Sequence, residues 1–137
     1  MNENFRSEFV PKHDAAHAQF VNGDPEPYLA LWSTAEPVSI MGGFGYVTYG
    51  QEQVRATLHK ASSRLSNATD YRNDVSVAVA QGELAYTVAI ESSTVSMDGE
   101  PARPTTLRVT TVCRLEDGQW RIVHRQGDLI PVVQVPA

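Results

Sequence analysis

The residues best suited to chemistry gather toward the C-terminus, in the segment 108–128, which reads RVTTVCRLEDGQWRIVHRQGD. Several ionisable side chains stand among its apolar and β-branched residues, including Arg114 and Arg125, and three of them are the candidates for chemistry: Arg108, His124 and Asp128. A histidine titrates at about pH 6.5 and a carboxylate can act as a base or a proton donor, so either side chain can move a proton. An arginine can stabilise developing negative charge. These three residues are therefore predicted to be catalytic in a proton-transfer reaction.

Two β-strands joined by a tight turn must position these side chains, because β-branched and aromatic residues flank Asp117-Gly118. A two-residue Asp-Gly turn would set Thr111 opposite His124. A three-residue loop that includes Glu116 would set Thr110 opposite His124 instead. We favour the three-residue loop, since it gathers four polar side chains on one face: Arg108, Thr110, His124 and Asp128. Alternation along the second strand adds two apolar residues to that face: Trp120 and Ile122.

Each of the three residues also has a structural interpretation. His124 could be a hydrogen-bonded core histidine, and Asp128 could cap a helix or pair with an arginine. Arg108 is expected to form a buried pair with Glu91 on the neighbouring strand. A buried ion pair is costly unless it is well hydrogen-bonded, so this pair is also a place where ligand chemistry is expected.

A second group of residues is expected to line a pocket for a small organic molecule. Aromatic and apolar side chains would form the wall, and a few polar groups would orient the ligand. The predicted ligand-binding residues are His17, Tyr28, Trp32, Met41, Phe44, Tyr46, Glu91 and Thr110. Core packing is the alternative for most of them. For His17, on the apolar face of a helix, a satisfied core histidine is favoured over catalysis.

Metal and cofactor chemistry are not expected. His13 and His17 have the spacing of a metal-binding pair, but neither an HExxH pattern nor a further Glu or Cys at ligand spacing accompanies them. The glycine-rich segment 42–46 lacks the strand-before, helix-after context of a phosphate-binding loop. The one cysteine, Cys113, is expected in mid-strand as a small buried apolar group.

The bulk composition describes one soluble globular domain over residues 1–137, with 42% hydrophobic and 20% charged residues. A net charge of −5 and the lack of a basic run argue against nucleic-acid binding. No apolar stretch approaches the roughly 20 residues of a membrane span, and the N-terminus lacks a signal-peptide core. A cytoplasmic protein without membrane contact is therefore expected.

Hydrophobic periodicity predicts three helices followed by a run of strands. The helices are expected over 7–21, 24–33 and 50–65, and a short strand over 37–41. The four long strands are expected over 71–80, 84–95, 105–115 and 119–130, with an irregular tail over 131–137. This order predicts an α+β fold, in which three N-terminal helices pack on a curved antiparallel sheet of four to six strands.

The segments GDPEPYLALW, TYGQEQVRATL and DGQWRIVHRQGD, in this order, resemble the nuclear-transport-factor-two-like superfamily. Its SnoaL-like branch is the most similar, on Leu107-Arg108-Val109-Thr110, Asp117-Gly118, Trp120 and Val123-His124-Arg125. The resemblance covers nearly the whole chain and implies a cystatin-like, cone-shaped barrel. It leaves the chemistry open, because the superfamily includes ketosteroid isomerases, polyketide cyclases, dehydratases, an epoxide hydrolase and kinase association domains.

The base of ketosteroid isomerases is an aspartate in the loop before the third helix, but here the loop 39–50 holds no carboxylate. The resemblance therefore implies two alternatives. One is a cofactor-free enzyme for isomerisation, cyclisation, dehydration or hydrolysis of a small apolar molecule. The other is a non-catalytic ligand-binding or assembly module. Three helices cannot cover both faces of the sheet, so a homodimer through the outer sheet face is expected.

Overall fold

The computed structural model of the chain describes residues 4–130. Its helices are α1 (Phe5–Phe20), α2 (Glu26–Leu29) and α3 (Gln51–Ser63). Its strands are β1 (Ser39–Met41), β2 (Val47–Tyr49), β3 (Leu65–Gln81), β4 (Leu84–Met97), β5 (Arg103–Glu116) and β6 (Gln119–Leu129). No helix among residues 4–130 is long and apolar enough to cross a membrane. The tail predicted over 131–137 lies outside the described residues.

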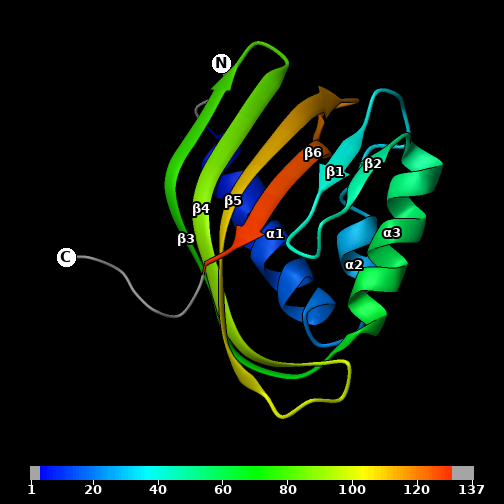
Figure 1. Ribbon diagram of the computed structural model, residues 1–137. Coiled ribbons are helices and arrows are strands. Elements are labelled where there is room, and N and C mark those ends of the chain that lie inside the picture. Colours follow the sequence, from blue (N-terminus) through cyan, green and yellow to red (C-terminus); the bar gives the residue numbers. More distant parts are fainter. Residues whose placement is uncertain (1–3, 131–137) are drawn as a thin grey trace.

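The strands form one sheet in the order β2-β1-β6-β5-β4-β3. Figure 1 shows that the sheet curves and that α1, α2 and α3 lie on the same side of it. The predicted α+β fold with a curved sheet is therefore confirmed. Four details differ from the prediction. β2 has no counterpart in it, and β1 runs parallel to β6 rather than antiparallel. The helix expected over 24–33 covers only Glu26–Leu29, and the strand expected from residue 71 begins at Leu65.

Aromatic residues at helical spacing hold α1 against the sheet. Phe5, Phe9 and Phe20 are each at most 6% exposed. His13 and His17 continue the same buried face of the helix. Because residues three or four positions apart share one face of a helix, the two histidines are carried into the interior with the phenylalanines.

The hairpin between β5 and β6 turns on Asp117-Gly118, and both residues have a positive φ, at +50° and +77°. Glu116 and Gln119 face each other across the turn. The loop therefore has two residues, with the left-handed conformations that an Asp-Gly turn of this length requires. The favoured three-residue loop is wrong.

A register shift interrupts the same hairpin. Cys113 faces Ile122, but the next pair is Val112 with His124, so Val123 is the extra residue of a β-bulge. One extra residue turns every side chain that follows it to the opposite face. Ile122 therefore points into the core while His124 lies on the outer face. The prediction that these two share a face is wrong, and so are both predicted cross-strand partners of His124.

The outer face of the sheet carries a strip of exposed apolar side chains. Leu84, Tyr86, Val88 and Ile90 alternate along β4 and are between 37% and 57% exposed. Val79 of β3 lies next to Tyr86 and is 42% exposed. These five residues are called the outer apolar strip below. Helices cover only the inner face, so this strip is uncovered in the single chain.

Candidate functional site

A cavity of about 100 Å³ lies between the inner face of the sheet, α3 and the segment 42–46 that joins β1 to β2. Its wall is mostly apolar, with Ile40 from β1, Leu58 and Ala61 from α3, and Val95 and Met97 from β4. Such a wall suits the hydrocarbon part of a ligand, because the transfer of apolar surface from water to an apolar environment is favourable.

Three polar side chains form the deep end of the cavity: His17 of α1, Tyr28 of α2 and Arg125 of β6. None of them is more than 7% exposed. A polar or charged side chain is costly to bury unless it has a partner. His17 and Arg125 share one partner, Glu91 of β4.

Arg125 and Glu91 form a buried pair with two hydrogen bonds. Arg125 Nη1 donates to Glu91 Oε2 and Nη2 donates to Oε1, each at 2.9 Å. Burial pushes the pKa of Glu91 upward, but the charge of Arg125, and after it His17, outweighs burial and holds that pKa well below its ordinary value. Gly127 lies beside the pair and adds no side chain there. The pair is therefore ionised on both sides.

His17 lies on the other side of the same carboxylate, with Nδ1 3.6 Å from Glu91 Oε1. Burial lowers the pKa of His17 to about 3, against the opposing effect of Glu91, so the imidazole is neutral at neutral pH. A carboxylate only accepts hydrogen bonds, so the ring proton is favoured on Nδ1. Nδ1 is buried and has no hydrogen-bond partner within reach, which leaves Nε2 as the nitrogen available to a molecule in the cavity that His17 lines. His17 thus presents a hydrogen-bond acceptor to a bound molecule.

His13 stacks on His17, with 5.4 Å between ring centroids, and its Nε2 lies 3.7 Å from Glu91 Oε2. Its Nδ1 lies 3.0 Å from Asp14 Oδ1, which also accepts a hydrogen bond from Asn73 Nδ2 at 2.7 Å. Two imidazoles and a guanidinium therefore surround the buried carboxylate. Within the described part of the chain, no three His, Cys, Asp or Glu side chains are arranged to hold a metal ion.

Aromatic side chains hold the His17 ring in place. Tyr28 meets it edge-on at 4.7 Å between centroids, and Trp32 meets Tyr28 edge-on at 6.2 Å. The Tyr28 hydroxyl and Trp32 Nε1 are buried without a hydrogen-bond partner. Burial raises the pKa of Tyr28 to about 12, so its phenol stays protonated. The ring that faces the cavity is therefore fixed by packing on both sides.

The shallow end of the cavity is bordered by Phe44 and Tyr46. The guanidinium of Arg64 lies 4.1 Å from the Phe44 ring centroid. Arg64 also donates to both carboxylate oxygens of Asp98, at 2.9 and 2.8 Å. Figure 1 shows the β4–β5 hairpin, which carries Asp98, reaching below the lower end of α3. Arg64 thus links this hairpin to the loop at the shallow end.

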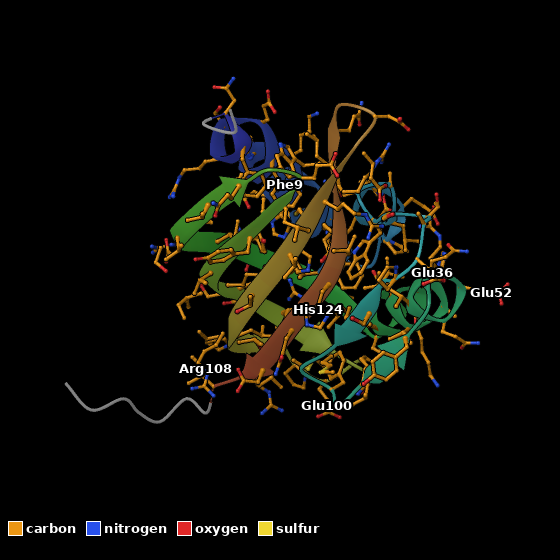
Figure 2. The ribbon with its side chains drawn as sticks, turned by 90° about the horizontal axis from the view of Figure 1, so that it is seen from above. Phe9, Glu36, Glu52, Glu100, Arg108 and His124 are labelled. Atoms are coloured by element: carbon orange, nitrogen blue, oxygen red, sulfur yellow. The ribbon has the colours of Figure 1, made fainter. Side chains whose placement is uncertain are left out.

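The three residues predicted to be catalytic lie on the outer face, away from the cavity. Arg108 and Asp128 are exposed, face each other across β5 and β6, and form an ion pair through two hydrogen bonds. His124 Nδ1 lies 2.8 Å from Ser39 Oγ. Figure 2 shows Arg108 at the end of the sheet far from Phe9 of α1. Arg108, His124 and Asp128 do share one face with Thr110, as predicted, but the cavity lies behind the opposite face.

The expected buried pair between Arg108 and Glu91 does not form. Glu91 faces Leu107 across β4 and β5, and its side chain points inward, whereas Arg108 faces Ile90 on the outer side. Arg125 takes the place of Arg108. Simple alternation along β6 could not identify it, because the bulge at Val123 decides that Arg125 points inward.

The predicted ligand-binding residues divide into three groups. Four of them line the cavity: His17, Tyr28, Phe44 and Tyr46. Glu91 and Trp32 lie one layer behind and contact cavity-lining residues. Met41 and Thr110 are not part of the wall. The sequence feature that indicated the cavity was therefore the mixture of aromatic and histidine residues on α1, α2 and the glycine-rich loop.

Comparisons with known proteins agree with this architecture. The family model for the SnoaL-like domain matches residues 13–132. A ketosteroid isomerase-like protein from Erwinia carotovora atroseptica has a similar structure, with a TM-score of 0.77 and 14% identity over 95% of this chain and 98% of that one. A protein of the NTF2-like family from Streptomyces avermitilis, assigned as a dehydratase, has a TM-score of 0.70 and 18% identity over 88% and 93% of the two chains.

A third similar structure comes from Exiguobacterium sibiricum and is assigned as a calmodulin-dependent kinase II association domain. It has a TM-score of 0.68 and 13% identity over 90% of this chain and 89% of that one. No curated protein matches the chain significantly. At these identities, the solved structures establish the fold and leave the chemistry to the site itself.

Proposed function

We propose that this chain, which belongs to the SnoaL-like domain family, binds a small, mostly apolar organic molecule in the cavity. The molecule's polar group would lie between His17 and Arg125. One observation carries the proposal: the apolar wall ends at an imidazole whose enclosed nitrogen faces a buried carboxylate. Apolar pockets with a few convergent polar groups are the usual form of small-molecule sites.

The size of the cavity limits the size of the ligand. A dry cavity of about 150 Å³ holds benzene, and the cavity here measures about 100 Å³. A short branched chain therefore fits the cavity as it stands, whereas a single ring needs a little more room on the side bordered by Phe44 and Tyr46. A larger ligand would have to displace the loop that carries Phe44 and Tyr46.

The deep end of the cavity also supports acid–base chemistry. With a pKa of about 3, His17 is a weak base in the empty cavity. It can take a proton on Nε2 because Glu91 stabilises the imidazolium that forms, and an N–H of Arg125 can donate to an oxygen that gains negative charge. This arrangement suits the cofactor-free reactions that the resemblance to the superfamily implies: isomerisation, cyclisation, dehydration or hydrolysis. It also supplies a base where the loop 39–50 has no carboxylate. The names of the similar isomerase-like and dehydratase-like structures support the same class of reaction.

Ligand binding is tested by filling the cavity. Ala61 lines it, whereas Ala56 lies exposed on the same helix. Benzyl alcohol is titrated into each protein, and the methyl resonances of Leu58 and Val95 are followed by NMR. Wild type and Ala56→Leu are expected to give saturable shifts, and Ala61→Leu to lose at least about tenfold in affinity, because the added methyl groups occupy the ligand's volume. Equal binding by both variants, or no shift in wild type, would contradict the proposal.

Catalysis is tested separately, by hydrogen–deuterium exchange at the α-carbon of cyclopentanone in heavy water. Wild type is expected to accelerate the exchange, and His17→Gln to abolish the acceleration while the fold is retained. The matched control is His124→Gln, which removes the histidine on the outer face. If wild type binds the ketone without accelerating exchange, the non-catalytic binding module is the correct alternative.

The outer apolar strip supports a homodimer through the outer sheet face. Its side chains are large and apolar and yet between 37% and 57% exposed, and contiguous exposed patches of this kind mark interaction sites. Arg108 and Asp128 lie beside the strip, in register with Ile90. A two-fold contact could place the arginine of one protomer against the aspartate of its partner.

A further inference from the structure

The deep end of the cavity is balanced in charge before any ligand enters. Arg125 contributes one positive charge and Glu91 one negative charge, and their two hydrogen bonds of 2.9 Å hold the charges together. His17, the third ionisable group at this end, is neutral at neutral pH. The deep end of the cavity therefore has no net charge when a ligand enters.

The groups that face His17 from each neighbouring element do not alter this balance. They are Glu91 of β4, Arg125 of β6, His13 of α1, Tyr28 of α2 and Tyr71 of β3. Burial keeps the phenols of Tyr28 and Tyr71 protonated by raising their pKa values. His13 lies between two carboxylates, with Asp14 Oδ1 3.0 Å from its Nδ1 and Glu91 Oε2 3.7 Å from its Nε2.

The hydrogen-bonding groups at the deep end are also of both kinds. His17 Nε2 is assigned as the acceptor, because the negative charge of Glu91, 3.6 Å from Nδ1, favours the ring proton on Nδ1. Arg125 has five N–H donors, and Glu91 occupies two of them. A hydroxyl group can donate to His17 and accept from Arg125 at once, and a carbonyl oxygen can accept from Arg125. A carboxylate can only accept, and it would face the lone pair of His17.

We infer that the cavity selects neutral ligands with a hydroxyl or carbonyl group and rejects carboxylates unless a proton enters with them at His17. The inference rests on the proposed function and specifies the ligand class of the same site. An anion at the deep end would leave one uncompensated negative charge in a buried place, and such a charge is strongly unfavourable. Protonation of His17 restores the balance, so the affinity for an anion must rise as the pH falls.

Benzamide and benzoate test the inference, because they have nearly the same shape and differ in charge. Each is titrated into the full chain at several values between about pH 6 and about pH 8, with the Ala61 and Leu58 methyl resonances as the readout. The dissociation constant of benzamide is expected to stay constant. That of benzoate is expected to weaken about tenfold for each pH unit, which is the signature of one proton taken up with the ligand. At about pH 8 benzoate should bind at least about a hundredfold more weakly than benzamide.

A variant without a proton site serves as the second test. In His17→Gln, the pH dependence of benzoate binding is expected to disappear, while the His124→Gln control on the outer face keeps it. A dependence that persists in His17→Gln would show that the proton enters on the carboxyl group of benzoate and not at His17, and would overturn the inference. Benzoate that binds wild type as tightly as benzamide at about pH 8, or with no pH dependence, would overturn the inference and leave the proposed function standing. If neither probe shifts a cavity methyl resonance, the proposed function fails and the inference fails with it.

Discussion

Arg125 of β6 donates two hydrogen bonds of 2.9 Å to Glu91 of β4, although β5 lies between the two strands. The two residues face different positions on β5, Thr111 and Leu107. The side chains thus meet above the inner face at Val109, where Gly127 contributes no side chain. A single ion pair therefore ties three strands together and also sets the charge of the cavity.

Removing one partner of this pair is expected to destabilise the protein strongly. Glu91→Gln leaves Arg125 as an uncompensated buried charge, and the expected loss in free energy of unfolding is about 3–5 kcal/mol. The measurement is urea denaturation at neutral pH. Arg125→Met is expected to cost a similar amount, because it leaves Glu91 unpaired.

The double variant Glu91→Gln/Arg125→Met provides the control. It buries no charge, so its loss should be clearly smaller than the sum of the two single losses. Additive losses would show that the two side chains do not interact in solution, and the charge balance of the cavity would then have no basis.

The neutral state of His17 predicts how stability depends on pH. Its pKa is about 3 in the folded chain and about 6.5 when unfolded, so between these values the unfolded chain binds one more proton. The free energy of unfolding is therefore expected to fall by up to about 1.4 kcal/mol for each pH unit below about pH 6.5. His17→Gln should have a flatter profile between about pH 6.5 and about pH 4.5. Parallel profiles for the two proteins would contradict a buried neutral His17.

Glu91 affects the pH dependence of the free energy of unfolding at lower pH than His17 does. Its pKa is held below the ordinary value, so its contribution to stability is present above the unfolded value of about 4.3 and is lost as the pH falls further. Wild type is expected to lose stability steeply below about pH 4, whereas Glu91→Gln should lack this component. Thermal unfolding followed by circular dichroism down to about pH 2.5 measures the difference.

A charge in the outer apolar strip is expected to prevent self-association. Val88 lies in the middle of the strip, between Tyr86 and Ile90 on the same face of β4. Val88→Glu should sediment as a monomer at concentrations where wild type sediments as a dimer, because the contact would bury two unpaired carboxylates. Ala56→Glu, on the exposed side of α3, is the matched control and should not change the sedimentation. A monomeric wild type would contradict the proposed homodimer.

Cys113 offers a probe of local opening of the core. Cys113 is fully buried, and burial raises the pKa of its thiol far above the ordinary value. A disulfide reagent is therefore expected to label it only as fast as the protein unfolds, with rates that increase with urea. Rapid labelling of the native protein would show that the core around β5 opens locally.

The sequence was sufficient for the fold because its signals are local. Period-two strands broken at Gln81-Gly82, Asp98-Gly99 and Asp117-Gly118 mark the hairpins, and the structure has its turns at these places. Four residues of the cavity wall could also be predicted from the sequence, because aromatic and histidine residues gather on the elements that enclose the cavity: His17, Tyr28, Phe44 and Tyr46.

The deep end of the cavity could not be predicted in the same way. Alternation along β6 depends on an unbroken register, and the bulge at Val123 reverses it. His124 and Arg125 therefore exchange faces relative to the prediction, and the partner of Glu91 becomes Arg125 instead of Arg108. No residue type in this segment announces a bulge. Its position shows only in the pairing of β6 with β5, where Val112 faces His124 and Cys113 faces Ile122.

The most direct test of the central claim is to locate a bound ligand relative to His17. Intermolecular nuclear Overhauser effects are measured between benzyl alcohol and the protein. The account predicts contacts from the aromatic protons to the Ala61 and Val95 methyl groups and from the CH₂ group next to the hydroxyl to the His17 ring. Contacts to Tyr86 and Val88 on the outer face instead, or none with the cavity wall, would contradict it.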